Sequence, residues 1–238
     1  MNWKLLAIVG VAALAAACTK PATESAATAE TAVIVPTTAP VAGGVYVVDP
    51  NHASLRWTIK HLGLSNYVAS FEDFKAEVTV DKENPGASSV KFSVVPGSIH
   101  TDFSGDFKAT HKDSPFGTWN DQITKGFLGA DKSPEFTFAS TAFALTGETT
   151  GTVTGDLSLN GVTKPVTLTV ELVGSGDAHP FTQTPAMGLH AHGVIKRSDF
   201  GVATEGPLNN FIGDDVEIAF DGEFIQPAAP AAPAAPAQ

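Results

Sequence analysis

A strict alternation of apolar and polar residues runs through the central part of this chain and limits what it can fold into. Successive side chains of a β-strand point to opposite faces of a sheet, so each alternating segment predicts a strand with one apolar and one polar face. Roughly eight or nine such segments follow one another. Their apolar members are Leu55, Trp57, Ile59, Phe74, Ala76, Val78, Val80, Val90, Phe92, Val94, Phe136, Phe138, Val153, Leu157, Leu159, Val166, Leu168, Val170, Leu172, Leu189, Ala191, Gly193, Ile195, Val216, Ile218, Phe220, Gly222 and Phe224.

Turn signals between these segments indicate how the strands pair. Asn160-Gly161 is the strongest short-range signal for a β-hairpin. Strands with one solvent-exposed face are typical of antiparallel sheets. The sequence therefore predicts an all-β domain that is either a barrel or a sandwich. Helix is sparse, and only residues 105–130, with Trp119 and Ile123 at helical spacing, favour a short helical segment.

The interior of such a barrel has two alternative uses. With about eight strands it holds either a packed row of side chains or one slim ligand. The chain contains 15 phenylalanines, which suit an apolar lining, although core packing explains them equally well. These observations leave both alternatives open.

The first 18 residues have the features of a bacterial export signal. Lys4 precedes an apolar run over residues 5–14, which is too short to span a bilayer, and small residues lead to Cys18. This end resembles the lipobox of bacterial lipoproteins, which implies that Cys18 is acylated and holds the protein on a membrane. Thr19 follows in place of Asp, which favours the outer membrane. The alternative is ordinary cleavage that releases a soluble periplasmic protein.

Both ends of the chain differ in composition from its centre. Residues 19–43 are rich in Ala, Thr and Pro, and residues 227–238 repeat Ala-Ala-Pro. We therefore expect a disordered tether and a disordered tail around one β-domain at residues 44–226.

Charge and motif content exclude several functions. The 25 acidic residues outnumber the 14 basic ones, and no basic cluster occurs, which argues against a nucleic-acid partner. The sequence lacks the Gly-x-Ser-x-Gly, His-Glu-x-x-His and glycine-rich phosphate-loop motifs of common enzymes. We therefore expect no catalytic residue, no enzyme activity and no cofactor.

Several longer motifs occur in a fixed order between residues 46 and 225. They are DPNHASLRWTIKHLG from Asp49, FEDFKAEVTVD from Phe71, GSIHTDF from Gly97, FLGADKSPEFTFAST from Phe127, GDLSLNGVTKPVTLTV from Gly155 and IKRSDFG from Ile195. In this order they resemble the YceI-like family of bacterial polyisoprenoid-binding proteins. The resemblance implies a lipocalin-like, extended antiparallel barrel in the cell envelope that holds an isoprenoid or a similar amphiphile. Residues 102–127 depart from the family pattern because they lack its Arg-Asp pair, so no head-group contact is carried over there.

Side chains with the apolar parity of the strands are the candidates to contact such a ligand. His61 shares this parity and either bonds a polar head group at the end of the lumen or is an ordinary structural histidine. The predicted ligand-binding residues are Leu55, Trp57, Ile59, His61, Phe74, Val78, Phe92, Val94, Phe136, Phe138, Leu157, Leu159, Leu168, Phe220 and Phe224.

Residues 188–201 contain the remaining candidate groups. His190 and His192 would point to the solvent side of a strand, where they lack a third and fourth ligand, so we predict no metal site. Arg197 and Asp199 match the family motif, and they either close the last turn of the barrel or contact a phosphate head group.

The leading hypothesis is a binding protein that carries or stores an isoprenoid or quinone-like lipid in the cell envelope. Its expected partners are this lipid and, through acylated Cys18, a membrane, and association of two protomers is left open. The second hypothesis is an envelope stress or interaction protein with a filled barrel and no lipid ligand. A lipid-modifying enzyme is the third.

Overall fold

The computed structural model describes residues 40–205 and 207–228. The predicted leader with Cys18, the tether up to residue 39 and the tail from residue 229 lie outside the described residues. The strands are β1 (Gly44–His61), β2 (Ser65–Phe71), β3 (Phe74–Val80), β4 (Ser89–Val94), β5 (Ile99–His100), β6 (Phe136–Leu145), β7 (Thr150–Leu159), β8 (Val162–Gly176), β9 (Ala186–Lys196) and β10 (Ile212–Ile225). The helical turns are η1 (Pro85–Ala87), η2 (Pro96–Ser98), α1 (Phe107–Thr110), α2 (Trp119–Asp121), η3 (Gln122–Phe127), η4 (Arg197–Phe200) and η5 (Pro207–Asn210).

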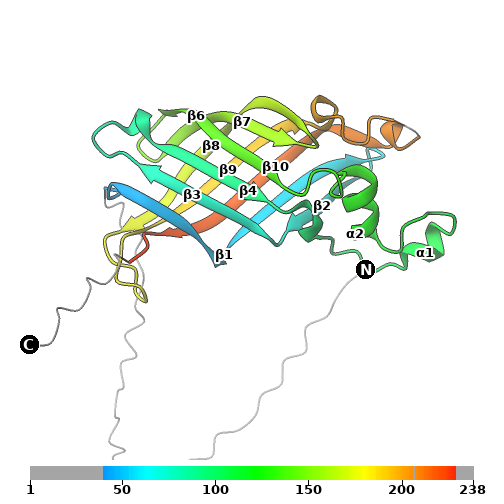
Figure 1. The fold of residues 1–238 in the computed structure, drawn as a ribbon, viewed down its shortest axis with the longest axis horizontal. Helices are drawn as coiled ribbons and strands as arrows, with labels where there is room; N and C mark the ends of the chain where they lie inside the picture. Colours follow the sequence, from blue (N-terminus) through cyan, green and yellow to red (C-terminus); the bar gives the residue numbers. More distant parts are fainter. Residues whose placement is uncertain (1–39, 206, 229–238) are drawn as a thin grey trace, which may run out of the picture. The chain divides into compact units, whose positions relative to one another are not determined.

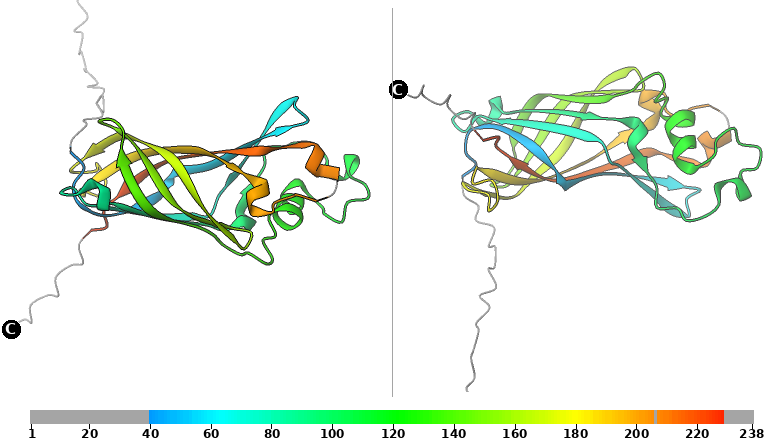
Figure 2. Two further views of the ribbon diagram at one scale, coloured as in Figure 1. Left: turned by 90° about the horizontal axis from the view of Figure 1, so that it is seen from above. Right: turned by 60° about the horizontal axis from the view of Figure 1, so that its bottom comes forward.

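The strands close into an antiparallel barrel (Figures 1 and 2). β3 pairs with the first part of β1 and β2 pairs with its last part, so β2 and β3 together act as one interrupted strand. From there the order runs through β4, β6, β7, β8, β9 and β10, and β10 pairs with β1 to close the ring. The predicted all-β barrel is confirmed, and the sandwich alternative is wrong.

The long strand β1 contains a bulge that the alternation pattern did not predict. Val48 pairs with Phe224 and Ala53 pairs with Gly222, so residues 49–52 stand opposite Glu223 alone. Extra residues in one strand shift the parity of the side chains that follow. For this reason the buried positions of β1 are even-numbered before the bulge, at Tyr46, and odd-numbered after it.

One end of the barrel is filled by packed side chains. Tyr46, Met187 and Phe224 are almost fully buried there and belong to the main core cluster. The Tyr46 hydroxyl donates a hydrogen bond to the Ala42 carbonyl oxygen (2.8 Å), and Val41 packs against the same cluster. Residues 41–43, at the end of the predicted tether, therefore contact the barrel.

The other end carries the helical segment between β5 and β6. α1, α2 and η3 lie in the region where a short helical segment was predicted (Figure 1). Ile123 is buried against Ala69 of β2 and Ile99 of β5, and this contact holds the segment to the barrel. Within the described residues, no helix has the length and apolar character needed to cross a membrane.

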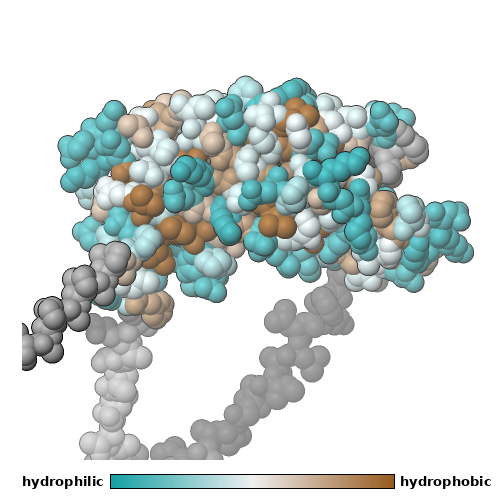
Figure 3. Space-filling view, viewed as in Figure 1, coloured by the Kyte–Doolittle hydropathy of each residue, from teal (hydrophilic) through white to brown (hydrophobic). Residues whose placement is uncertain are grey.

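The outer face of the barrel is mixed in character. Figure 3 shows hydrophilic, neutral and hydrophobic residues interspersed over the wall that faces the viewer. Along β8 the exposed and half-buried residues alternate strictly from Val162 to Val173. The apolar side of each strand is therefore turned mainly toward the interior, as expected for a single antiparallel sheet that closes on itself.

Gly155 of β7 offers a direct test of this interior packing. A Cβ atom there would lie 2.5 Å from Cζ of Phe138 and 2.5 Å from the backbone oxygen of Ala139. We expect Gly155→Ala to lower the free energy of unfolding by about 1–3 kcal/mol, the usual cost of overpacking. Urea unfolding followed by circular dichroism measures this. Gly97→Ala is the control, because no atom lies within 4 Å of its added Cβ; equal losses in the two variants would contradict the packing.

Candidate binding cavity

The barrel encloses a cavity of about 550 Å³. Every strand except β5 contributes to its wall, and the helical segment and η4 add further residues. Ligand sites in proteins commonly have volumes of about 300–1,000 Å³, so this space is large enough for a substantial ligand. Beyond the filled end, the interior is thus not fully occupied by side chains.

Of the predicted ligand-binding residues, all except Phe74 line this cavity. The residues placed in the wall are Leu55, Trp57, Ile59, His61, Val78, Phe92, Val94, Phe136, Phe138, Leu157, Leu159, Leu168, Phe220 and Phe224. Phe74 is absent because its ring is used in packing: it stacks on Phe92 with centroids 5.6 Å apart and meets Phe220 edge-on at 6.0 Å. Contact of these residues with a ligand stays a prediction.

The cavity has an apolar end and a more polar end. Phe92 and Phe220 meet edge-on, with centroids 5.5 Å apart, toward the filled end of the barrel. His61, Gln122 and Arg197 line the opposite end, beside the helical segment and the loop that precedes β10. An elongated ligand with an apolar chain and one polar end fits this distribution.

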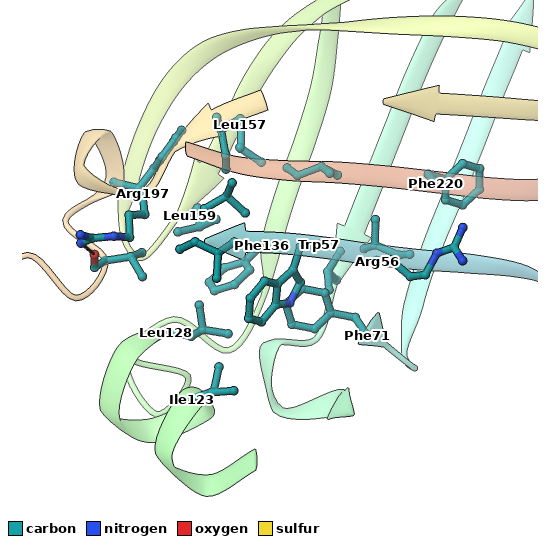
Figure 4. A pocket seen from close by; sticks show the side chains of 18 of the residues that line it. Arg56, Trp57, Phe71, Ile123, Leu128, Phe136, Leu157, Leu159, Arg197 and Phe220 are labelled. Carbon is teal, nitrogen blue, oxygen red and sulfur yellow. Dashed lines mark hydrogen bonds between the residues drawn. The ribbon is translucent and has the colours of Figure 1, made fainter. Parts of the chain in front are cut away.

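The helical segment forms one side of the polar end. Figure 4 shows Ile123 and Leu128 below the rings of Trp57 and Phe136. Phe136 belongs to the main core cluster, and Leu128 packs against that cluster. The alternation of strand residues could not indicate Ile123 or Leu128, because the segment between β5 and β6 has no period of two.

Aromatic rings extend the lining from the strands to the helical segment. Tyr67 of β2 stacks on Phe103 with centroids 4.3 Å apart, and it lies 5.9 Å from Trp57 and 6.5 Å from Trp119. Trp119 in turn meets His111 edge-on at 4.7 Å. All five side chains line the cavity, so aromatic rings form much of the wall at its polar end. The alternation Tyr67, Ala69, Phe71 was the signal in the sequence that could have indicated Tyr67.

Two buried polar atoms in this wall make no hydrogen bond of good geometry within the described residues: the Tyr67 hydroxyl, which has only the Thr101 hydroxyl nearby, and Oε1 of Gln122. The neighbouring Thr101 donates its hydroxyl to Oδ1 of Asn120 (2.8 Å). Burial raises the pKa of Tyr67 to about 12, so its hydroxyl remains protonated and can donate a hydrogen bond at neutral pH. Unpaired buried polar groups are costly, and both residues line the cavity, which makes them candidates to pair with a polar group of a ligand.

Arg197 is the one buried charged residue within the described part of the chain, with 5% of its surface exposed. Its Nε donates to the Gly213 oxygen (2.8 Å) and its Nη1 donates to the oxygens of Val202 (3.0 Å) and Ala203 (2.7 Å). Its Nη2 donates to Oδ1 of Asn209 (2.8 Å). These bonds use the donors of the guanidinium group to hold the loop before β10 and the start of that strand.

The Arg-Asp pair of the sequence motif is not an ion pair in the fold. Asp199 accepts a hydrogen bond from Lys164 Nζ (2.6 Å), whereas Arg197 bonds to the loop before β10 and to the start of that strand. Of the two interpretations from the sequence, the geometry supports closure of the loop by Arg197. Its donors are occupied, so they are not available to a phosphate head group.

His190 and His192 lie on the outer wall, as their parity predicted. Nδ1 of His190 is 2.8 Å from Oδ1 of Asp221, and the two imidazole rings stack with centroids 5.1 Å apart. Neither residue lines the cavity. These two histidines therefore belong to the barrel wall and do not form part of the candidate binding site.

An exposed apolar border surrounds the turn between β1 and β2. Leu62 and Leu64 in this turn are exposed, and the Leu62 amide donates to the Phe211 carbonyl oxygen (2.6 Å), which places exposed Phe211 beside them. The neighbouring residues His61 and Ser65 line the cavity. The border is thus continuous with the polar end of the cavity, which we call the mouth.

Comparison with known proteins agrees with this geometry. The model of the YceI-like domain matches residues 46–224. The YceI protein of Escherichia coli is 36% identical over 180 residues, which covers 74% of this chain and 85% of that protein. The crystal structure of BcnA from Burkholderia cenocepacia has a TM-score of 0.61 at 24% identity and covers 74% of this chain and 98% of that one.

A third similar structure is a polyisoprenoid-binding domain from Saccharophagus degradans, implicated in plant cell wall breakdown. It has a TM-score of 0.53 at 13% identity and covers 78% of this chain and all of that domain, so the likeness concerns the fold alone. The match of the domain model over most of the chain, together with the identity to the Escherichia coli protein, shows that this chain belongs to the YceI-like family.

Proposed function

We propose that the barrel binds one isoprenoid or similar long-chain lipid and carries or stores it in the bacterial cell envelope. The observation that supports this most strongly is the cavity of about 550 Å³ with an almost wholly apolar wall. An isoprenoid chain gains about 25 cal/mol per Å² of apolar surface removed from water. The polyisoprenoid-binding domain of Saccharophagus degradans supports the same ligand class.

The head group we propose is uncharged and bears a hydroxyl, as in a polyprenol or a quinol. Oε1 of Gln122 accepts but cannot donate, so it can pair with a ligand hydroxyl, and the Tyr67 hydroxyl can donate to a ligand oxygen. A phosphate head group is less suitable because the donors of Arg197 are already bonded to the loop.

Binding rather than a reaction is proposed because the cavity wall is apolar and the sequence has no catalytic motif. The exposed apolar border formed by Leu62, Leu64 and Phe211 supports entry of the lipid through the mouth. Export through the leader and attachment through acylated Cys18 remain part of this proposal. The second hypothesis, an interaction protein with a filled barrel, is less favoured because the interior contains a cavity.

Titration with a purified polyprenol, followed by tryptophan fluorescence, tests this function. Trp57 and Trp119 both line the cavity, so a bound chain changes their surroundings. We expect a saturable change with one lipid per barrel. An unchanged emission spectrum, together with no retention of the lipid after gel filtration, would contradict the proposal.

Tyr67→Phe tests the proposed head-group contact. Loss of one hydrogen bond is expected to weaken binding of a polyprenol by about two- to twelvefold, because a net hydrogen bond contributes about 0.5–1.5 kcal/mol. Stability without lipid should change little, since the hydroxyl makes no hydrogen bond of good geometry and the neighbouring Thr101 donates to Asn120. The hydrocarbon that lacks the terminal hydroxyl serves as the matched ligand. An equal loss for both ligands would show that the hydroxyl of Tyr67 does not contact the head group.

A further inference from the structure

The cavity ends where the filled end of the barrel begins, and three strands show the position of this boundary. On β3, β8 and β9 the last residues that line the cavity toward the filled end are Val78, Val170 and Leu189. The next residue of the same parity is absent from the wall and belongs to, or packs against, the main core cluster; these residues are Val80, Leu172 and Met187. The cavity therefore ends within one step of two residues, about 6.6–6.8 Å, on each of these strands.

Phe224 of β10 lies at this boundary. It pairs with Val48 of β1 on one side and with Met187 of β9 on the other, and neither of these two residues lines the cavity. Phe224 does line the cavity, and it is also a member of the main core cluster with 2% of its surface exposed. It is therefore the residue of β10 that borders both the cavity and the packed core.

Phe220 lies nearer the mouth on the same strand, but its ring does not close the cavity before Phe224. Figure 4 shows Phe220 on the opposite side of the cavity from Arg197. A Cβ atom at Gly222 would lie 2.5 Å from Cζ of Phe220, so the ring lies over Gly222 along the barrel wall. A glycine in a strand commonly marks such a close approach. Because Gly222 leaves this space to the ring, the cavity continues past Phe220 to Phe224.

The structure behind Phe224 leaves no route for a longer chain. Tyr46 and Met187 of the same cluster are buried, with 1% and 4% of their surfaces exposed. Just beyond Phe224, the Gln226 amide donates to the Pro185 oxygen (2.9 Å), and its side-chain Nε2 donates to the Gly43 oxygen (3.0 Å). These bonds fasten the end of β10 to the segments before β9 and β1. Close-packed interiors of this kind do not yield to a ligand without a cost in stability.

We propose that Phe224 sets the length of the lipid chain that the barrel accepts. The inference rests on the proposed binding of a long-chain lipid and adds the residue that selects among such lipids. Tyr67 and Gln122 are the proposed head-group contacts at the mouth, and Phe224 closes the other end. Each added isoprene unit that fits between them removes more apolar surface from water and strengthens binding. A longer chain meets the Phe224 ring, and its head group leaves the contacts at the mouth.

A series of polyprenols that increase by one isoprene unit tests this role, with the full chain titrated under tryptophan fluorescence. The length limit is the longest chain whose last unit still raises the affinity. In Phe224→Ala the lost ring leaves an apolar space continuous with the cavity. We expect the length limit to increase by at least one isoprene unit, and the first polyprenol beyond the wild-type limit to bind about tenfold more tightly to the variant. Shorter polyprenols should bind equally to both proteins.

Phe107→Ala is the matched control for Phe224→Ala. Phe107 is buried, with 4% of its surface exposed, but it does not line the cavity, so the same truncation should leave the length limit unchanged. Circular dichroism checks that each variant is folded. Phe224→Leu removes only part of the ring, and if Phe224→Ala does not fold, this variant must shift the relative affinity toward the longer chain by about threefold or more.

The outcomes separate this inference from the proposed function. Binding of polyprenols by the wild-type protein, with the same length limit in a folded Phe224→Ala, would overturn the role of Phe224 alone. An equal increase of the length limit in Phe107→Ala would also overturn it, because the effect would then follow from loss of stability. A wild-type protein that binds no polyprenol of any length would overturn the proposed function and this inference together.

Discussion

Replacement of Arg197 by methionine is expected to lower the free energy of unfolding by about 3 kcal/mol or more. The guanidinium group is buried and donates hydrogen bonds to the carbonyl oxygens of Val202 and Ala203 in the loop before β10 and to that of Gly213 at the start of β10. Methionine has a similar length but no hydrogen-bond donor. The carbonyl oxygens therefore lose their partners inside the protein, where water replaces them poorly. Urea unfolding followed by tryptophan fluorescence measures the loss.

Two companion variants separate this role from simple charge pairing. Asp199→Asn removes only the exposed contact with Lys164, so its cost should be below about 1 kcal/mol. Arg197→Lys keeps the charge but cannot reproduce the planar set of donors, and it should recover only part of the stability. A loss for Asp199→Asn as large as that for Arg197→Met would contradict the loop-closing role of Arg197.

Blocking the cavity should have the largest effect on ligand binding. Ala191 of β9 lines the cavity and pairs with Val170 of β8 and Phe220 of β10, so a tryptophan at this position projects into the lumen between two apolar neighbours. Each chain methylene that it excludes costs about 0.8 kcal/mol, and the exclusion of two or more weakens binding by at least about tenfold. Equilibrium binding of a polyprenol measures the effect.

Ala139→Trp is the control for this variant. Ala139 lies on β6 and is exposed, so the same substitution adds the same ring to the outer face. Its lipid affinity should equal that of the wild type. Unchanged affinity in Ala191→Trp, with the fold intact by circular dichroism, would show that the lipid does not occupy the lumen.

The sequence predicted those parts of the fold that depend on a regular period. Alternation placed residues such as Leu55, Phe136 and Phe220 on the inner face, and the Asn160-Gly161 turn joins β7 to β8 as the hairpin signal indicated. The direction of a side chain follows from its parity in a strand, which is a local property. Phe74 shows the limit of this argument, because parity does not decide whether an inward ring borders a cavity or packs against other rings.

The features that the sequence did not reveal depend on contacts between distant segments. The β1 bulge brings His52 close to Glu223. Nothing in the local sequence pattern indicates that residues 49–52 of β1 lie opposite a single residue of β10. Gln122 enters the cavity wall from a helical turn without a regular period. Pairing between β1 and β10 joins the first and last strands and decides between a barrel and a sandwich, which alternation alone cannot do.

Native mass spectrometry of residues 40–228, produced in a bacterial host and purified without detergent, tests the central claim most directly. The account predicts one long-chain lipid per barrel, released on denaturation and identified as an isoprenoid with an uncharged, hydroxyl-bearing head group. A protein that carries no lipid, and that gains no mass after incubation with a polyprenol or a quinol, would contradict it.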